Sequence, residues 1–316
     1  MPQGQSNTQK TFILKSGTLW AKVTERTEHA LRCGALQPIP TDCEFVEQDG
    51  VNFLVRVLHI LARKDEAKKQ QEKTSNDSGK EFNPFLPYDE DLFVADISDT
   101  HLCLLNKFNV IDHHLLIVTR AFEEQDTLLN LQDFEAMWAC LAEIDGLAFY
   151  NGGKLAGASQ RHKHLQLVPL PLVPNGPNVP IEPALASAAF EGSIGTVSSF
   201  PFVNAIAKFD PDWIESPFKA ASSTLECYHA LLQAVGLNPG THESNSQQSG
   251  AYNLLATRQW MLLIPRSSEE FKSISVNSLG FAGTLAVRNE QHMKILIEQG
   301  PMTVLRNVGV SIESES

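Results

Sequence analysis

Three polar side chains alternate over five residues near the middle of this 316-residue chain. If residues 161–168 form a strand, His162, His164 and Gln166 project from one face, and the residues between them project from the other. A neutral imidazole is a nucleophile, and two histidines are also a partial ligand set for a metal ion. The spacing alone therefore leaves open catalysis, a metal site completed by distant ligands, and a solvent-facing strand with incidental histidines.

The approach to this strand has the composition of an anion site. Asn151-Gly152-Gly153 and Gly157-Ala158-Ser159 precede it, and small residues let backbone N–H groups come close to phosphate oxygens. No acidic residue occurs between Asp145 and Glu182, although the net charge of the chain is −12. The same interval contains three basic residues, Lys154, Arg161 and Lys163. These neighbours favour phosphate chemistry over the other two interpretations.

His164 is the better candidate for the nucleophile. A backbone carbonyl that accepts a hydrogen bond from one ring N–H holds a histidine as a neutral tautomer, and the other nitrogen is then free to attack phosphorus. His164 has a same-face partner on each side, His162 and Gln166, to orient its ring and to bind phosphate oxygens. We therefore predict covalent nucleotidyl transfer through His164.

Hydropathy patterns predict the elements that position these residues. Apolar residues at helical spacing predict helices over 51–63, 130–144, 222–235 and 284–299. Short apolar runs predict strands over 102–105, 115–119 and 161–168, and a hairpin from 252–257 and 260–264. Asn130 is the expected N-cap of the second helix, and Gly300-Pro301 is the expected end of the last one. The polar run 64–80 predicts a solvated helix end or a loop.

Composition limits the class of protein. A pI near 5.3 argues against nucleic acid and anionic membranes as partners, because both repel acidic surfaces. The five cysteines form no Cys-x-x-Cys pair, and no apolar run reaches the ~20 residues that span a bilayer. We expect a cytoplasmic protein. The prolines over 169–183 predict a boundary between an N-terminal catalytic region, 1–172, and a C-terminal region, 184–311.

The central motif resembles the signature of the histidine-triad (HIT) superfamily, His-x-His-x-His, in the variant that ends in glutamine. Asn106–Val110 together with His114–Leu116 resembles the ribose-binding hairpin of that superfamily, which gives His114 a supporting role. A wider set of segments resembles the diadenosine tetraphosphate phosphorylases, also called ATP adenylyltransferases. These segments are Phe82–Pro87, Asn106–Phe108, Gly157–Gln166, Tyr252–Leu255 and Trp260–Arg266.

The resemblance implies an α+β fold, in which a HIT-like antiparallel sheet with packed helices carries a C-terminal elaboration that completes the nucleotide cleft. It implies phosphorolysis of diadenosine tetraphosphate to ADP and ATP, and the reverse reaction, through AMP bound to His164. It implies that Asn106 contacts ribose and that Lys80 reaches the polyphosphate. It also implies phosphate contacts from Asn151, Gly157, Ala158, Ser159 and Gln166.

A second anion site is expected near the C-terminus. Gly280 and Gly283 precede the last predicted helix, where backbone amides and the helix dipole favour anions. Lys272 and Asn277 lie just before these glycines, and we expect both to contact the second nucleotide.

Gln166 indicates the reaction class. An amide donates and accepts hydrogen bonds but delivers no proton at neutral pH, so an acceptor that is already ionised, such as phosphate, is favoured over water. The expected partners are diadenosine tetraphosphate, ATP, ADP, AMP and phosphate. No tightly bound cofactor and no metal ligand set is expected beyond a divalent cation, Mg²⁺ or Mn²⁺, that accompanies the nucleotide. The sequence makes no prediction of oligomeric state.

Three alternatives stay open. A hexose-1-phosphate nucleotidyltransferase shares the His-x-His-x-Gln motif, although its usual zinc-binding cysteine pair is not seen here. A noncatalytic nucleotide-binding HIT protein would retain the same pocket. A metal-dependent hydrolase built on His162 and His164 is the least favoured, because acidic ligands are lacking nearby.

Overall fold

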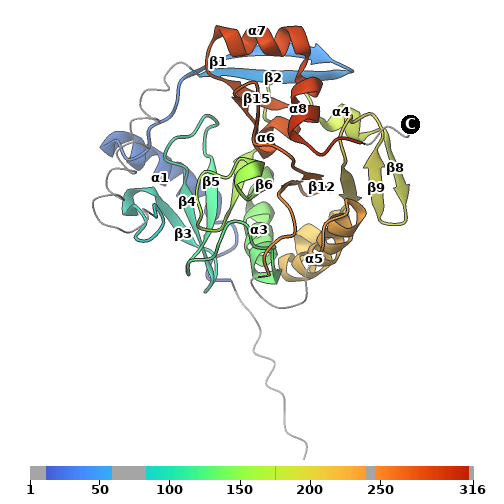
Figure 1. Ribbon diagram of the computed structural model, residues 1–316. Coiled ribbons are helices and arrows are strands. Elements are labelled where there is room, and N and C mark those ends of the chain that lie inside the picture. The colour runs from blue at the N-terminus through green and yellow to red at the C-terminus, as the bar shows by residue number, and fades with distance from the viewer. Residues whose placement is uncertain (1–11, 59–82, 175, 240–245, 313–316) are drawn as a thin grey trace, which may run out of the picture.

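The computed structural model describes residues 12–58, 83–174, 176–239 and 246–312. Within these residues, ten strands form one antiparallel sheet in the order β3-β4-β5-β7-β6-β11-β12-β10-β9-β8 (Figure 1). In chain order these strands are β3 Phe93–Asp96, β4 His101–Leu105, β5 Leu115–Thr119, β6 Gly146–Gly152, β7 His164–Pro169, β8 Ala188–Glu191, β9 Ile194–Val197, β10 Ala205–Lys208, β11 Tyr252–Ala256 and β12 Trp260–Pro265. Strands from both predicted regions join this sheet where β6 pairs with β11.

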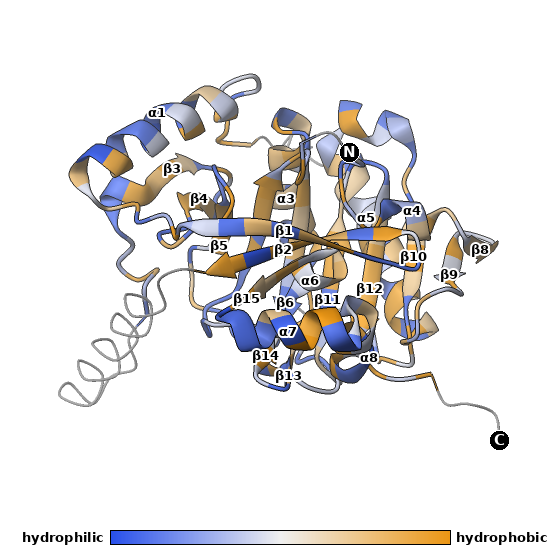
Figure 2. Cartoon of the chain, turned by 90° about the horizontal axis from the view of Figure 1, so that it is seen from above, coloured by the Kyte–Doolittle hydropathy of each residue, from blue (hydrophilic) through white to orange (hydrophobic). Residues whose placement is uncertain are grey.

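Helices cover both faces of the sheet, whose strands are mainly apolar (Figure 2). One core cluster packs the sheet against three helices, α1 Leu19–Cys33, α3 Leu131–Glu143 and α5 Pro217–Ala234. A second cluster involves α4 Glu182–Leu185, α6 Ser278–Phe281, α7 Glu290–Gln299 and α8 Pro301–Val308. Three short 3₁₀ helices are also described: η1 Glu90–Leu92, η2 Lys154–Ala156 and η3 Pro211–Glu215.

Two smaller sheets complete the described structure. One has the order β1-β2-β15 and consists of β1 Thr41–Gln48, β2 Val51–Leu58 and β15 Thr284–Val287. The other is a two-stranded hairpin, β13 Glu270–Phe271 and β14 Ile274–Ser275. No helix in the described part of the chain is both long enough and apolar enough to cross a membrane.

Several sequence predictions are confirmed. Strands β4 and β5 are an antiparallel pair, and β11 and β12 form the expected hairpin. Helix α3 begins after Asn130, whose side chain accepts a hydrogen bond from Asp133 N–H, while Asp133 accepts one from Asn130 N–H. This reciprocal capping explains why the helix starts at that residue.

The predicted helix over 51–63 is wrong, because residues 51–58 form strand β2. Asp49 and Gly50 both have positive φ and join β1 to β2 by a two-residue turn, which is a strong hairpin signal. The β-branched Val51, Val55 and Val57 also suit a strand. Apolar residues at helical spacing were misleading here; residues 59–82 lie outside the described part.

The last predicted helix, 284–299, is wrong in its first part. Residues Thr284–Val287 form β15, which pairs in parallel with β2. Helix α7 starts only after Asn289, whose side chain accepts a hydrogen bond from His292 N–H. Gly300 ends α7 as expected, but Pro301 begins a further helix, α8, because proline is well tolerated at the first helical position.

Candidate active site

His164 has the geometry of a prepared nucleophile. Its side chain lies at the start of β7 and is buried beside the ring of Phe85, with 5.4 Å between ring centroids. Its Nδ1 lies 2.8 Å from the carbonyl oxygen of His162. Because a carbonyl only accepts, Nδ1 carries the proton and Nε2 keeps the lone pair. Burial lowers the pKa of His164 to about 4, so the ring is neutral near pH 7.

His162 holds that carbonyl in place. Its Nε2 donates to the carbonyl oxygen of Thr119 at 2.7 Å, and its Nδ1 accepts from the side-chain amide of Asn83 at 3.0 Å. Both ring nitrogens are thus bonded to protein groups. This differs from the expectation that the ring of His162 binds phosphate oxygens, and it makes His162 a positioning residue for His164.

Gln125 fixes the backbone of His164. Its side-chain oxygen accepts from His164 N–H at 2.8 Å, and its amide nitrogen donates to the carbonyl oxygens of His164 at 3.2 Å and Asn151 at 3.0 Å. The residue is almost fully buried. Gln125 therefore joins β7 to the end of β6, and both strands carry predicted site residues.

Gln166 is oriented by a chain of hydrogen bonds. Asn106 donates from its amide nitrogen to His114 Nδ1 at 3.2 Å, and His114 Nε2 donates to the side-chain oxygen of Gln166 at 2.9 Å. Because the side-chain oxygen of Gln166 accepts from His114, its NH₂ group is left to donate a hydrogen bond. Gln166 lies on the same face of the sheet as His164. This contact agrees with the supporting role expected of His114, and that role stays a prediction. Ribose contact by Asn106 stays a prediction.

The glycine-rich segment turns tightly beside the strand. Gly157 has a φ of 85°, and a Cβ there would come within 2.9 Å of both Asn277 Cβ and the Val276 carbonyl oxygen. Only glycine fits this left-handed backbone and close approach. Ala158 N–H donates within the segment to the Gly153 carbonyl at 3.3 Å, whereas no described residue accepts from Ser159 N–H.

Asn151 lies on the face of β6 that adjoins the glycine segment. Its side-chain oxygen accepts from the amide of Asn253 at 3.0 Å, from Ser278 N–H at 2.9 Å and from the Ser278 hydroxyl at 2.8 Å. Arg266 is buried and donates to the side-chain oxygen of Asn253. These contacts hold helix α6 and the preceding Asn277 next to Gly157. Phosphate contact by Asn151 stays a prediction.

Two of the three basic residues near the motif do not create a positive site. The strand predicted over 161–168 begins only at His164, so Lys163 lies just before β7; it is fully buried, with Nζ 2.7 Å from Asp133 and 3.3 Å from Glu123. Arg161 forms an ion pair with Glu124. The composition of the interval between Asp145 and Glu182 does not reveal these partners, because Glu123, Glu124 and Asp133 precede it. Lys154 is exposed on η2.

The expected second anion loop is not formed by Gly280 and Gly283. A Cβ at Gly280 would meet Val276 at 2.6 Å, and one at Gly283 would meet Pro180 at 2.8 Å, so both glycines serve close packing. Asn277 caps α6 through Leu279 N–H at 3.0 Å and adjoins Gly157. Lys272 lies exposed in the β13-β14 turn, where its Nζ is 5.4 Å from the centroid of the Phe271 ring. Lys80 lies outside the described residues.

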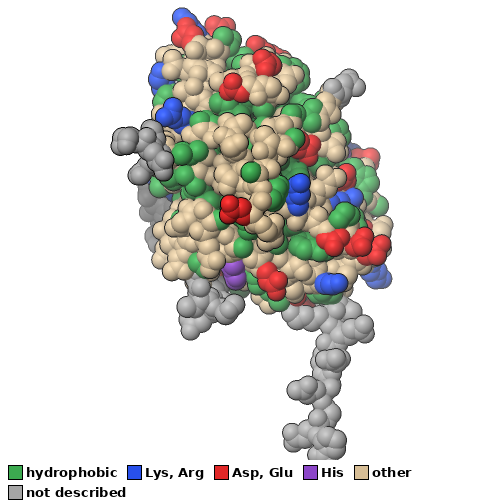
Figure 3. Space-filling view, turned by 90° about the vertical axis from the view of Figure 1, so that its right-hand side faces the viewer, with side chains coloured by type: hydrophobic (Ala, Val, Ile, Leu, Met, Phe, Trp, Pro, Cys, Tyr) green, Lys and Arg blue, Asp and Glu red, His purple; other side chains and the backbone are tan. Residues whose placement is uncertain are grey.

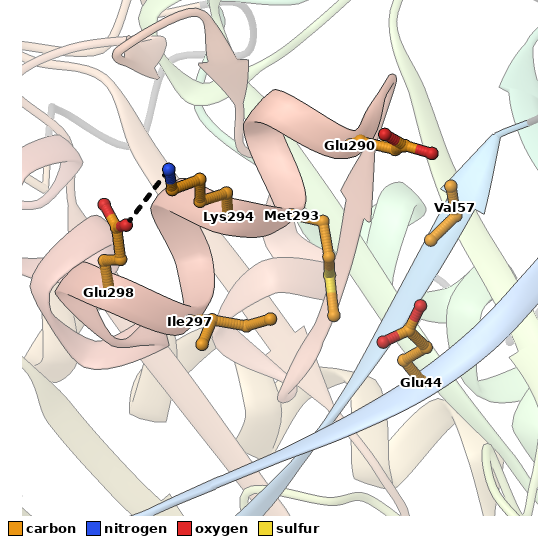
Figure 4. Close-up of a pocket in the computed structure, with 7 residues that line it drawn as sticks. All are labelled: Glu44, Val57, Glu290, Met293, Lys294, Ile297 and Glu298. Atoms are coloured by element: carbon orange, nitrogen blue, oxygen red, sulfur yellow. Dashed lines mark ion pairs between the residues drawn. The ribbon is translucent and has the colours of Figure 1, made fainter.

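A hollow of about 300 Å³ lies away from these residues, between α7 and the β1-β2 pair (Figure 4). Met293, Ile297 and Val57 give it an apolar floor. Three carboxylates also line it, those of Glu44, Glu290 and Glu298. Lys294 also lines the hollow and pairs with Glu298 at 3.7 Å, but the carboxylates outnumber this one basic group. A lining of net negative charge repels polyphosphate, so this hollow is not the nucleotide site.

The face seen in Figure 3 presents acidic and basic side chains scattered among uncharged ones. No basic stripe runs across the described residues on that face.

The arrangement has a specific chemical capacity. A neutral imidazole with one nitrogen fixed and the other unprotonated can accept a phosphoryl group, and the Gln166 amide can bind its oxygens. Sequence reasoning missed Thr119 and Gln125, which have no motif of their own. Asn83 and Phe85 fall inside the segment Phe82–Pro87 that carried part of the resemblance, so that segment was the available signal.

Family comparisons agree with this geometry. Residues 9–187 match the model described as the Ap4A phosphorylase N-terminal domain, where Ap4A is diadenosine tetraphosphate. Residues 198–311 match the model described as the ATP adenylyltransferase C-terminal domain. The diadenosine 5',5'''-P1,P4-tetraphosphate phosphorylase 2 of Saccharomyces cerevisiae is 28% identical over 274 residues, which cover 79% of this chain and 81% of that protein.

Solved structures show the same fold. The crystal structure of yeast Ap4A phosphorylase Apa2 aligns with a TM-score of 0.75 at 21% identity, covering 96% of this chain and 98% of that one. The structure of the same protein in complex with Ap4A aligns with a TM-score of 0.74 at 20% identity, covering 95% of this chain and 100% of that one. The expected α+β fold, with its HIT-like antiparallel sheet, is thereby confirmed.

Proposed function

This chain belongs to the Ap4A phosphorylase family, and on that premise we propose that it cleaves Ap4A with phosphate to give ADP and ATP, and joins them in the reverse reaction. The observation that carries the proposal is the 2.8 Å contact between His164 Nδ1 and the His162 carbonyl, because it leaves Nε2 as a nucleophile. The members of this family are nucleotidyltransferases, and so is this chain.

In the first step, His164 Nε2 attacks the α-phosphorus of Ap4A. A P–N bond forms, the bond from that phosphorus to the bridging oxygen breaks, and ATP leaves with the bonding electrons. The ring, which still carries its Nδ1 proton, becomes positively charged. The carbonyl dipole of His162, 2.8 Å from Nδ1, stabilises that charge.

In the second step, a phosphate oxygen attacks the same phosphorus. The P–N bond breaks, its electrons return to His164 Nε2, and ADP leaves. The NH₂ group of Gln166 donates to a nonbridging oxygen in both steps, because His114 holds the side-chain oxygen of Gln166 on its other side. Neither step requires a proton from Gln166, since ATP leaves as an anion and phosphate arrives as one.

The direct test incubates the protein with Ap4A, with and without phosphate, and follows nucleotides and intact mass. We expect ADP and ATP in equal amounts with phosphate, and a protein adduct of AMP mass without it. Galactose 1-phosphate is the comparison acceptor for the hexose-1-phosphate alternative. Discharge of the adduct by galactose 1-phosphate but not by phosphate would overturn the proposal, and so would the absence of any adduct or turnover.

The pH dependence of the first step follows from the burial of His164. Burial lowers its pKa to about 4, against the raising effect of the His162 carbonyl, so Nε2 stays unprotonated down to that pH. We expect the rate constant for adduct formation to be level from about pH 8 to about pH 5 and to fall below about pH 4. Rapid-quench experiments without phosphate measure this rate constant. Because phosphate is absent, its own ionisation does not contribute to the pH dependence.

A fall in that rate constant beginning near pH 6.5, the ordinary pKa of histidine, would contradict this assignment. Unfolding is a separate effect and is followed by circular dichroism. The unfolded chain binds a proton at His164 near pH 6.5, whereas the folded chain does so only near pH 4. The folded state therefore loses stability as the pH falls through this interval.

Replacing Gln166 by histidine tests the choice of acceptor. An imidazole at this position can take a proton from water and deliver one to a leaving group, so Gln166→His raises the ratio of AMP to ADP produced by about 10-fold or more. Chromatography of the products at fixed phosphate measures the ratio. Gln233→His, on the exposed side of α5, is the matched control. An unchanged ratio in Gln166→His would show that Gln166 does not set the acceptor.

The proposal extends to the ligands that the reaction needs. ATP, ADP and phosphate are substrates and products of the two steps, and AMP is the group that His164 carries. A divalent cation, Mg²⁺ or Mn²⁺, accompanies the polyphosphate and offsets its charge. The cytoplasmic location stays a prediction.

A further inference from the structure

Three side chains with metal-ligating atoms lie together outside the proposed nucleotide site. His29 and Cys33 are four residues apart on α1 and therefore share one side of the helix. Asp91 lies on η1, which packs against α1. The ligand atoms of the three residues all lie within 4.8 Å of one another, and His29 Nε2 is 2.7 Å from Asp91 Oδ1.

The donor set determines which ion suits this cluster. Imidazole nitrogen, thiolate sulfur and carboxylate oxygen together favour zinc, whereas Mg²⁺ and Ca²⁺ prefer oxygen alone. A tetrahedral zinc ion holds its ligand atoms about 3.3–3.8 Å apart, given bonds of about 2.0–2.3 Å. In the cluster, His29 Nε2 and Asp91 Oδ1 are closer than this, at 2.7 Å, and no pair of ligand atoms is more than 4.8 Å apart, so an ion requires these side chains to adjust. A thiolate and a carboxylate also supply two negative charges for one Zn²⁺.

We propose that His29, Cys33 and Asp91 form a binding site for Zn²⁺, with water as the fourth ligand. The side chains of His29 and Asp91 are 41% and 50% exposed, and Cys33 is exposed, so an ion enters from solvent without unfolding. The Cys33 thiol contacts the Ala30 carbonyl oxygen at 3.6 Å and also hydrogen bonds with the Asp91 carboxylate. When the thiol ionises to bind metal, these contacts are replaced by bonds from sulfur and carboxylate to the ion.

An ion at this site connects two parts of the structure, helix α1 and the segment before β3. The segment that begins with Asn83 and Phe85, which contact the catalytic rings, continues into η1 and Asp91. Helix α1 also contacts the loop before β5, where Thr27 hydrogen bonds with His113 Nδ1 at 3.1 Å. A zinc ion therefore joins α1 to the segment that holds His162 in place. This inference is independent of the proposed reaction.

The test titrates chelator-treated protein with ZnCl₂ by calorimetry, in two buffers of different ionisation enthalpy. We expect one zinc per chain and release of about one proton, as the Cys33 thiol ionises. Cys33→Ser and Asp91→Asn each weaken zinc binding by about 100-fold. Cys43→Ser, at an exposed cysteine on β1, is the matched control and binds zinc as the unaltered protein does.

Cobalt provides a second readout that a general change in stability does not mimic. With Co²⁺ in place of zinc, a sulfur-to-cobalt absorption band is expected in the unaltered protein and in Cys43→Ser, but not in Cys33→Ser. Thermal midpoints without metal show whether each variant folds. His29→Gln, at a partly buried position, removes the third ligand and is expected to weaken zinc binding as well. Zinc binding by Cys33→Ser as tight as that of the unaltered protein would overturn the site, and so would no binding at about 100 µM zinc.

Discussion

Replacing His164 by alanine is expected to lower the rate of Ap4A phosphorolysis by about 10⁴-fold or more, because the covalent route then has no nucleophile. No other described residue next to Gln166 has an unprotonated ring nitrogen in the same position, since both nitrogens of His162 are bonded to protein groups. Measurements of ADP and ATP production at saturating phosphate, together with intact mass, check this expectation. The AMP adduct is absent in this variant.

Two further variants separate loss of the nucleophile from loss of structure. His164→Asn keeps a polar side chain but cannot carry AMP, so it is as inactive as the alanine variant. His162→Asn changes the residue that positions the ring and is expected to lower kcat by about 10²-fold while still forming the adduct slowly. Thermal midpoints confirm that each variant folds. Phosphorolysis by His164→Ala within tenfold of the unaltered rate would refute the covalent route.

Replacing Asp133 by asparagine is expected to cause the largest loss of stability, about 3–5 kcal/mol in the free energy of unfolding. Asp133 is fully buried, lies 2.7 Å from Lys163 Nζ and hydrogen bonds with His101 Nε2 at 3.1 Å. Without the carboxylate charge, the ammonium of Lys163 stays buried with a single partly exposed carboxylate, that of Glu123. Thermal and urea unfolding measure the loss, and the expected fall in midpoint temperature is about 10 °C.

The pH dependence of this loss has a definite sign. Burial raises the pKa of Asp133, but the charge of Lys163 and hydrogen bonds from His101 and Lys163 outweigh it, so the pKa is lowered to about 2. The carboxylate therefore contributes stability above about pH 4, the unfolded value, and this contribution is lost as the pH falls toward 2. The difference between the unaltered protein and Asp133→Asn should shrink over the same interval.

Asp96→Asn is the matched control for charge removal. Asp96 pairs with Arg120 at the surface, where both side chains are partly exposed, so its loss costs about 0–1 kcal/mol. Lys163→Met combined with Asp133→Asn removes both charges and should cost less than the sum of the two single changes. Equal stability losses in Asp133→Asn and Asp96→Asn would contradict the importance assigned to the buried pair.

The amino-acid sequence alone determined which side chains share the active face. Alternation along a strand places His164 and Gln166 on one side of β7 and Leu165 on the other, whatever the rest of the chain does. The residue that caps the start of α3, Asn130, is also recognised from its immediate neighbours, and Gln166 is read directly from the sequence. Local features of this kind need only a few neighbouring residues, so they can be predicted from sequence.

Only the tertiary structure decided how the nucleophile is held. Thr119, Gln125 and Asn83 reach His162 and His164 from segments far away in sequence, and no periodicity or spacing marks them. The same is true of β15, which is a strand because β2 lies beside it. Hydrogen bonds between distant segments depend on how the whole sheet and its helices pack, and that packing also pairs Lys163 with Asp133. It therefore removes from the site a positive charge that the sequence had appeared to place there.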